Sequence, residues 1–377
     1  MDIRSRVVHG GDQPRDAMGA VSVPIYATAT FAHPGVGEST GFDYSRIENP
    51  TRTHLERLLA DLEQGVDAVA CSTGMAALAC VGELFAPGDH IIHSDDLYGG
   101  SIRYFRTVMA KNGVTFDAVD TNDIEALRAK IGPTTKAIFV ETPTNPMMLV
   151  TDIAAVAELA REAGLLLIVD NTFLSPYFQN PIRLGANIVV HSGTKYLGGH
   201  NDSLAGYVVV DSQELAERIR AIFGSVGYAL GPFDAWLQIR GIKTLALRME
   251  ASQSNAITIA GWLRGHPKVR AVHYVGLADH PGIEVTRRQS RGFGSMLSFE
   301  VDEEATAIAV LNRVRLLQYA ESLGGVESLI TYPYTQTHAD VPDAERRARG
   351  INERLLRVSV GVEAASDLIA DLAQALT

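Results

Sequence analysis

Short apolar runs that alternate with helical patterns are the feature that most constrains the fold of this chain. Residues 165–169, 188–190 and 207–210 are continuously apolar, without the alternation of a half-exposed strand. A strand that is apolar on both faces is typical of a parallel sheet covered by helices on each side. Three further runs extend the pattern toward the N-terminus, at residues 66–70, 91–92 and 137–140. The sequence therefore predicts an α/β fold with a mostly parallel sheet.

Helical periodicity occupies the segments between these runs. Leu55, Leu58, Leu59 and Leu62 recur at the spacing of one helix face, and a second helix is expected over 75–84. Beyond residue 245 the pattern changes to one long helical segment, two strands and a closing helix, at residues 245–263, 296–301, 355–360 and 367–376. We therefore expect an α/β domain and a smaller α+β C-terminal domain, over residues 51–245 and 246–377.

The first 50 residues differ from both of these regions. Residues 1–50 are rich in Gly, Pro, Thr and aromatic residues and show little periodicity, which predicts an extended arm. The arm is too apolar to be a free tail, because it carries Val21, Val23, Tyr26 and Phe31. We expect it to pack against another surface, such as a neighbouring subunit.

Charge and cysteine content narrow the class of protein. The formal net charge is −11 and no basic run stands out, which argues against nucleic acid or an anionic membrane as a partner. Cys71 and Cys80 are the only cysteines, too few for a disulfide framework and in keeping with a reducing cytoplasm. No apolar stretch reaches the roughly 18 residues of a membrane span, and the N-terminus lacks a signal-peptide pattern. We expect a cytoplasmic protein, and we assign no metal site.

Two residues at the ends of apolar runs suggest a specific chemistry. Lys195 follows the run at 188–190, and Asp170 follows the run at 165–169. A lysine amine can form a Schiff base with pyridoxal phosphate (PLP), and an aspartate can keep the pyridine nitrogen protonated. Taken singly, a surface lysine and an aspartate that opens a turn explain the two positions better. The other polar motifs favour the PLP interpretation.

These motifs also follow apolar runs. Gly74 lies where a strand gives way to a helix, and free N–H groups at a helix N-terminus bind anions such as phosphate. Ser192 and Thr194 could bind the same phosphate, although turn hydrogen bonds would also explain them. Tyr98 could stack on a flat heterocycle, or be a half-buried tyrosine. Arg357 lies inside an apolar run, where a charge needs a partner: a substrate carboxylate or an internal salt bridge.

In their order along the chain, the motifs resemble those of the Cys/Met-metabolism PLP-dependent enzymes. This family includes cystathionine γ-synthase, cystathionine γ-lyase, methionine γ-lyase and O-acetylhomoserine sulfhydrylase. The resemblance extends over essentially the whole chain, at residues 44–46, 49–52, 72–77, 96–100, 141–146, 169–173, 191–202, 320–325, 337–338 and 356–361. It implies the aspartate-aminotransferase-like fold, type I of the PLP enzymes, and PLP as the cofactor.

The resemblance also implies roles for the residues that would hold the cofactor. Lys195 would form the Schiff base and shuttle protons, and Asp170 would pair with the pyridinium nitrogen. Tyr98 would stack on the ring and assist proton transfer, and Asn145 would lie by the phenolic oxygen. Four residues would bind the phosphate within the subunit: Gly74, Met75, Ser192 and Thr194.

Further implied roles concern the substrate and the assembly. Arg357 with Ser322 would hold the α-carboxylate, and Glu321 would engage the amine of cysteine or of the distal end of cystathionine. Arg103 is a candidate partner for a distal carboxylate. Tyr44 and Arg46 would reach the phosphate of the neighbouring subunit, so that a dimer is the smallest competent unit. The usual assembly is a homotetramer, a dimer of dimers.

Within the family, the motifs favour a cystathionine γ-synthase, which joins an O-acetyl- or O-succinyl-L-homoserine to L-cysteine. Cystathionine γ-lyase and O-acetylhomoserine sulfhydrylase are the alternatives. Gly100 stands where methionine γ-lyases have a cysteine, which argues against that activity. Ile47 replaces a second arginine that is frequent in enzymes using the succinyl ester, which favours the acetyl ester. A non-catalytic protein is a remote alternative, because Lys195, Asp170 and Tyr98 are all present.

Overall fold

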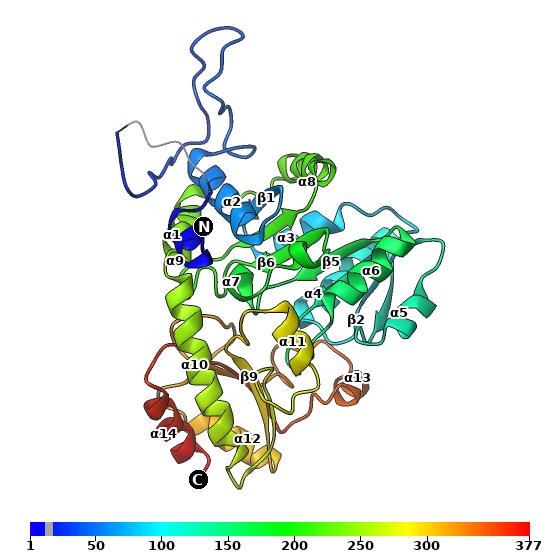
Figure 1. The fold of residues 1–377 in the computed structure, drawn as a ribbon, viewed down its shortest axis with the longest axis vertical. Helices are drawn as coiled ribbons and strands as arrows, with labels where there is room; N and C mark the ends of the chain where they lie inside the picture. Colours follow the sequence, from blue (N-terminus) through cyan, green and yellow to red (C-terminus); the bar gives the residue numbers. More distant parts are fainter. Residues whose placement is uncertain (12–17) are drawn as a thin grey trace.

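The computed structural model describes residues 1–11 and 18–377 (Figure 1). The larger sheet of this described part has seven strands. The strand order is β1-β7-β6-β5-β4-β2-β3. The strands are β1 (Asp67–Cys71), β2 (His90–Ser94), β3 (Thr115–Val119), β4 (Thr135–Glu141), β5 (Leu166–Asp170), β6 (Ile188–Ser192) and β7 (Gly206–Val210). Neighbours pair in parallel except β7, which runs antiparallel to both β1 and β6. The predicted mostly parallel sheet is therefore confirmed.

Helices cover both faces of this sheet, and each face contributes to its own apolar cluster. Ile138 and Val140 of β4 belong to the same cluster as Leu55 of α2, whereas Phe139 belongs to the cluster that contains Ala77 of α3. The helices of this part are α2 (Pro50–Glu63), α3 (Gly74–Gly82), α4 (Gly99–Tyr104), α5 (Ile124–Lys130), α6 (Ile153–Ala163), α7 (Ser175–Phe178), α8 (Gln213–Val226) and α9 (Pro232–Ile242). A π-helical turn (Phe105–Met109) and two 3-10 helices (Ala110–Asn112 and Pro181–Leu184) complete it.

A second, mainly antiparallel sheet follows, with the order β10-β11-β12-β9-β8. Its strands are β8 (Val269–His273), β9 (Met296–Val301), β10 (Gln318–Tyr319), β11 (Leu329–Thr331) and β12 (Leu355–Ser359). Residues of α10, α12 and α14 close a third apolar cluster over it. The helices here are α10 (Leu245–Arg264), α11 (Ile283–Gln289), α12 (Glu304–Arg313), α13 (Asp343–Ala348) and α14 (Ala365–Ala375). The domain limits at residues 50 and 245 stay predictions.

The N-terminal region is partly helical, so the expectation of an extended segment is wrong for its beginning. Residues Ile3–His9 form α1, because the buried side chain of Val7 packs into the same cluster as α2. Residues 12–17 of the predicted arm lie outside the described residues. From Met18 to Glu48 the chain has no helix, and part of it projects from the body of the molecule (Figure 1). The rest contacts the body, since Val23 packs against the core cluster of α2 and the Tyr26 N–H donates to Thr51 Oγ1 at 3.0 Å.

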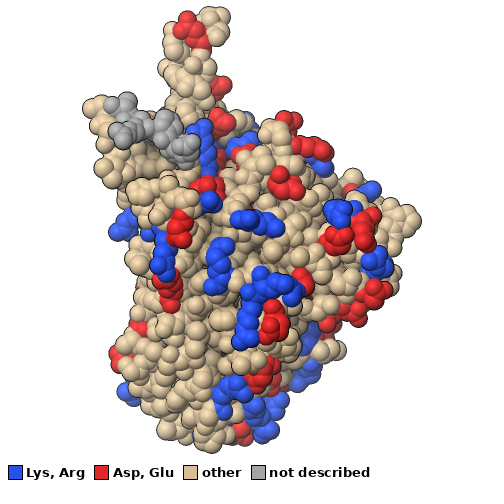
Figure 2. Space-filling model, viewed as in Figure 1, with Lys and Arg blue, Asp and Glu red and all other residues tan. Residues whose placement is uncertain are grey.

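The surface and the helix lengths add two observations. On the face shown in Figure 2, basic and acidic side chains are interspersed, and the projecting arm is mostly uncharged. None of the helices in the described part of the chain is both long enough and apolar enough to span a bilayer.

Candidate active site

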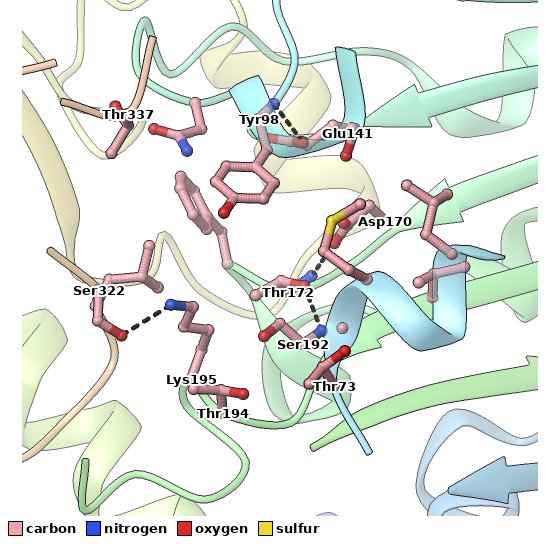
Figure 3. Close-up of a pocket in the computed structure, with 18 of the residues that line it drawn as sticks. Thr73, Tyr98, Glu141, Asp170, Thr172, Ser192, Thr194, Lys195, Ser322 and Thr337 are labelled. Carbon is pink, nitrogen blue, oxygen red and sulfur yellow. Dashed lines mark hydrogen bonds between the residues drawn. The ribbon is translucent and has the colours of Figure 1, made fainter. Parts of the chain in front are cut away.

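A cavity of about 350 Å³ lies at the carboxyl ends of the central parallel strands, the usual ligand position in open α/β sheets. Glu141, Asp170 and Ser192 end β4, β5 and β6 and line it (Figure 3). The structure brings together eleven residues predicted from the sequence: Gly74, Met75, Tyr98, Asn145, Asp170, Ser192, Thr194, Lys195, Glu321, Ser322 and Arg357.

Three predicted residues lie outside the lining of this cavity. Tyr44 and Arg46 belong to the arm, where the Arg46 guanidinium lies 5.7 Å from the centre of the Tyr44 ring and donates to the carbonyl of Gly224. Arg103, on α4, pairs instead with Asp340 at 2.7 Å, and both side chains are more than half exposed. Their roles toward a neighbouring subunit or a distal carboxylate stay predictions.

Lys195 follows β6, and its amine is held inside the cavity. The Nζ atom donates a hydrogen bond to Ser322 Oγ at 2.8 Å (Figure 3). Burial, with a smaller contribution from the Arg357 charge, lowers the pKa of the amine to about 8, against the opposing charge of Glu321. A neutral amine is the form that attacks an aldehyde. The position of Lys195 is therefore suited to Schiff-base formation.

Asp170 supplies a buried carboxyl group at the end of β5. Its Oδ1 atom accepts a hydrogen bond from the Thr172 N–H at 2.9 Å. Burial raises the pKa of this carboxyl group, and the donors of Thr172 and the charge of His191 oppose that rise. Among the described residues, Asp170 takes part in no ion pair. A cationic ring nitrogen in the cavity would give it a partner.

The start of α3 forms an anion cradle next to Ser192. Thr73 caps the helix, and its side chain accepts from the Ala76 N–H at 3.0 Å. The N–H groups of Gly74 and Met75, in the first turn, have no acceptor within the helix. A Cβ atom at Gly74 would lie 2.9 Å from Ser192 Cβ, so only glycine allows this close approach. Thr194 also lines the cavity, and its hydroxyl donates to the Ala205 carbonyl and accepts from the Ala205 N–H.

These residues fit PLP. The cavity presents an amine for the aldehyde, a carboxyl group for the pyridine nitrogen and a helix N-terminus for the phosphate, which are the three features by which proteins hold this cofactor. The ring of Tyr98 projects into the same space, and the residue is 40% exposed, so the ring is accessible for stacking (Figure 3).

Arg357 is a buried cation that no carboxylate of the described residues pairs with. It lies on β12 and is 1% exposed, and Nη1 donates to Asn145 Oδ1 at 2.9 Å. Nη2 donates to the Ser322 carbonyl and to Thr331 Oγ1, both at 3.0 Å, while Nε has no partner in the described part of the chain. Burial lowers the pKa of the guanidinium to about 10. The structure contains no ion pair to Arg357 among its described residues, so the internal salt bridge considered from the sequence is wrong.

Several lining residues were not singled out as site residues from the sequence: Ser101, Glu141, Thr172, Phe173, Leu204 and Thr337. Glu141 had a detectable signal, because it ends the apolar run at 137–140 just as Asp170 ends the run at 165–169. Thr337 brings its main chain so close to Gly99 that any Cβ atom there would collide with the Thr337 carbonyl oxygen. The segment around Thr337 thereby forms a wall of the cavity beside Tyr98.

Comparisons with known proteins agree with this site. The model of the family described as Cys/Met metabolism PLP-dependent enzyme matches residues 4–377. Cystathionine γ-lyase of Bacillus subtilis is 49% identical, over 100% of this chain and 99% of its own. A cystathionine β-lyase of Lactococcus lactis is 48% identical, over 99% of this chain and 98% of its own. The B. subtilis cystathionine γ-synthase/O-acetylhomoserine (thiol)-lyase is also 48% identical, over 99% of this chain and 96% of its own.

A solved structure gives the same result for the fold. The crystal structure of cystathionine γ-lyase from Lactobacillus plantarum complexed with L-serine has a TM-score of 0.97 and 45% identity. The similarity covers 100% of this chain and 98% of that one. The predictions of the PLP-enzyme fold and of PLP as the cofactor are confirmed. The chain belongs to the Cys/Met-metabolism family of PLP-dependent enzymes.

Proposed function

We propose that the protein catalyses γ-replacement on an O-acylated L-homoserine, with L-cysteine as the nucleophile and L-cystathionine as the product. The observation that carries this proposal is that one cavity holds two residues of opposite charge. Arg357 is buried and has no carboxylate partner among the described residues, and Glu321 is exposed. Arg357 suits the α-carboxylate of the first amino acid, because a buried guanidinium needs an anion. Glu321, at the mouth, suits the ammonium group of the second amino acid.

The chain's own residues then divide the work. Bound PLP supplies the electron sink for charge that develops at Cα and Cβ. Arg357, together with Ser322, orients the substrate so that its Cα–H faces Lys195. The Lys195 amine takes the proton from Cα and relays a proton from Cβ. The Tyr98 hydroxyl, in the same cavity, assists this proton transfer. Asp170 holds the ring nitrogen protonated, and the α3 N-terminus fixes the phosphate.

Cystathionine γ-lyase is the second candidate, because the B. subtilis enzyme of that name is 49% identical to this chain. The same residues would serve γ-elimination of cystathionine to cysteine, 2-oxobutanoate and ammonia. O-acetylhomoserine sulfhydrylase, in which sulfide replaces cysteine, is the third. The balance among these reactions depends on how the second substrate is held at Glu321.

The proposal extends to the donor and the assembly. Ile47, in place of a second arginine, favours the acetyl ester over the succinyl ester. Tyr44 and Arg46 lie outside the cavity of their own chain, which supports an arm that completes the cofactor site of a neighbouring subunit in a dimer or tetramer. A cytoplasmic location is in keeping with Cys71 and Cys80, which are both buried and unpaired.

The test is a product assay with the purified PLP-loaded protein. O-acetyl- or O-succinyl-L-homoserine is supplied with and without L-cysteine, and products are followed by mass spectrometry. We expect cystathionine, formed rapidly only with cysteine and faster from the acetyl ester. In a matched arm, Glu321→Gln should raise the KM for cysteine about tenfold, because a hydrogen bond to a charged group is lost. The KM for the homoserine ester should stay unchanged.

The same assay separates the alternatives. If no cystathionine forms and added cystathionine yields cysteine and 2-oxobutanoate, the protein is a γ-lyase and our first proposal is wrong. Release of homocysteine and pyruvate from cystathionine would instead indicate β-elimination, the activity named for the L. lactis relative. Homocysteine formed from the acetyl ester and sulfide, in preference to cysteine, would indicate a sulfhydrylase.

A further inference from the structure

Two carboxyl groups lie side by side at one wall of the cavity. Glu141 ends β4 and Asp170 ends β5, and the two residues are partners in the register of these parallel strands. Residues in register on neighbouring strands point to the same face, with backbones about 5 Å apart. Both side chains line the cavity (Figure 3). The pair is therefore positioned to act on the same part of the cofactor site.

Glu141 is tied to Tyr98 by one of its two oxygen atoms. Glu141 is 5% exposed, and its Oε2 atom accepts from the Tyr98 N–H at 3.0 Å (Figure 3). The other oxygen, Oε1, is buried and has no hydrogen-bond partner among the described residues. The main chain of Tyr98, at the start of α4, is thus anchored to the wall of the cavity. A proton on Oε1 would leave that anchor intact.

The surrounding charges disfavour two anions at this wall. The charged groups that face Glu141 are Asp170 on β5, Asp96 after β2 and, more distantly, Arg357 on β12. Burial, followed by the charge of Asp170, raises the pKa of Glu141 well above its ordinary value, and this outweighs the opposing N–H groups of Tyr98 and Asn145. Asp170 has donors of its own in Thr172 and a stabilising charge in His191. One shared negative charge is thus best placed on Asp170.

We propose that Glu141 is a positioning residue that stays protonated in the holoenzyme. As a neutral carboxylic acid it anchors the main chain of Tyr98, and hence the stacking ring, while Asp170 keeps the negative charge that the pyridine nitrogen needs. Glu141 would act through Tyr98 and Asp170 rather than by contact with the reacting atoms. The inference rests on PLP binding and not on which substrate the enzyme uses.

The charge state is tested with Glu141→Gln in the PLP-loaded protein. Glutamine keeps the size of the side chain and an acceptor for the Tyr98 N–H, but it cannot ionise. We expect the pH midpoint of the visible cofactor absorbance to stay where it is in the wild type. A fall of the midpoint by about one unit or more would mean that a nearby negative charge had been removed, and would overturn the proposal.

The positioning role is tested by comparing Glu141→Met with Glu141→Gln. Methionine fills the space but leaves the Tyr98 N–H without its acceptor. We expect PLP to bind about tenfold more weakly and the visible circular dichroism of the cofactor to change, with both effects absent in the glutamine variant. Wild-type PLP affinity and circular dichroism in the methionine variant would contradict the positioning role. If that variant does not fold, the glutamine titration still decides the charge state. These readouts need no substrate, so they are independent of the proposed reaction.

Discussion

At the scale of single residues, burial has its clearest chemical effect on the Lys195 amine. With a pKa of about 8, roughly one amine in ten is neutral at pH 7, against fewer than about one in a thousand for an exposed lysine. Only the neutral amine attacks the PLP aldehyde. We therefore predict that the rate at which apoprotein gains visible absorbance after PLP addition rises with pH and levels off above about pH 8.

Two variants should move this midpoint in opposite directions. Arg357→Gln removes a charge that lowers the pKa of the amine, so the midpoint should rise. Glu321→Gln removes a charge that raises it, so the midpoint should fall. Stopped-flow absorbance measures both, with Lys195→Ala as the variant that forms no imine to the protein. A rate that keeps rising to pH 10 in the wild type would contradict the lowered pKa.

Single residues also show how far a sequence defines a site. Lys195 and Asp170 are predictable only together with the other polar motifs, because taken singly each has a simpler explanation. Arg357 is ambiguous in the sequence, because whether a buried arginine has an internal carboxylate partner depends on residues far along the chain. In the structure its donors contact Asn145, Ser322 and Thr331, all at least 26 residues away.

At the scale of elements, α2 connects the arm to the body of the molecule through a buried arginine. Arg52 is 1% exposed, and it donates to the carbonyls of Ser45 at 2.7 Å and Ile47 at 2.9 Å. Its Nε lies 3.3 Å from the carboxylate of Glu56, which in turn accepts from the Ala70 N–H of β1. Arg52 thus holds the residues on either side of Arg46 against the strand that leads to the phosphate cradle.

Removal of Arg52 should lower the stability of the fold. We predict that Arg52→Met lowers the free energy of unfolding by about 3 kcal/mol or more, because the Glu56 carboxylate and two carbonyls lose a buried cation. The stability of Arg52→Lys should lie between those of the wild type and Arg52→Met, since an ammonium group cannot reach all the acceptors at once. Arg218→Met, on the exposed face of α8, is the matched control and should change stability by less than about 0.5 kcal/mol. Urea unfolding measures all three, and equal effects at both positions would contradict the argument.

The elements that the sequence predicts least well are those with one exposed side. The central strands are evident as apolar runs because both of their faces are buried. In the edge strand β3 only Val119 is buried, and polar residues interrupt the apolar run that would indicate a strand. In α1 a single side chain, Val7, is buried, which is too little to give a helical period. Such elements depend on tertiary contacts that no local pattern records.

At the scale of the whole molecule, the site as we propose it draws on three regions of the sequence. The larger sheet supplies Asp170 and, just after β6, Lys195, and the second sheet supplies Arg357 on β12 and Ser322 between β10 and β11. The arm carries Arg46, which lies outside the cavity of its own chain. Arrangements of this kind are predictable from a family resemblance, but not from local patterns, because no local pattern says which copy of the chain an arm contacts.

Subunit mixing tests the proposed sharing of sites. Arg46→Ala and Lys195→Ala should each be nearly inactive alone. After the two are unfolded and refolded together, we predict recovery of roughly a quarter of the wild-type activity, because half of random dimers are mixed and each mixed dimer has one intact site. Each variant refolded alone is the control. No gain on mixing, with mixed dimers confirmed by native mass spectrometry, would mean that Arg46 does not act across subunits.

The contact between Gly99 and the Thr337 main chain bears on how such an enzyme can diversify. A side chain at position 99 fits only if the segment around Thr337 retreats, and that retreat would reshape the wall beside the cofactor ring. The residue that fits at position 99 therefore depends on the position of the Thr337 main chain, although 238 positions separate the two in the chain. We therefore expect a side chain at position 99 to be tolerated only with a second change near Thr337, whereas the exposed Glu321 is open to single substitutions.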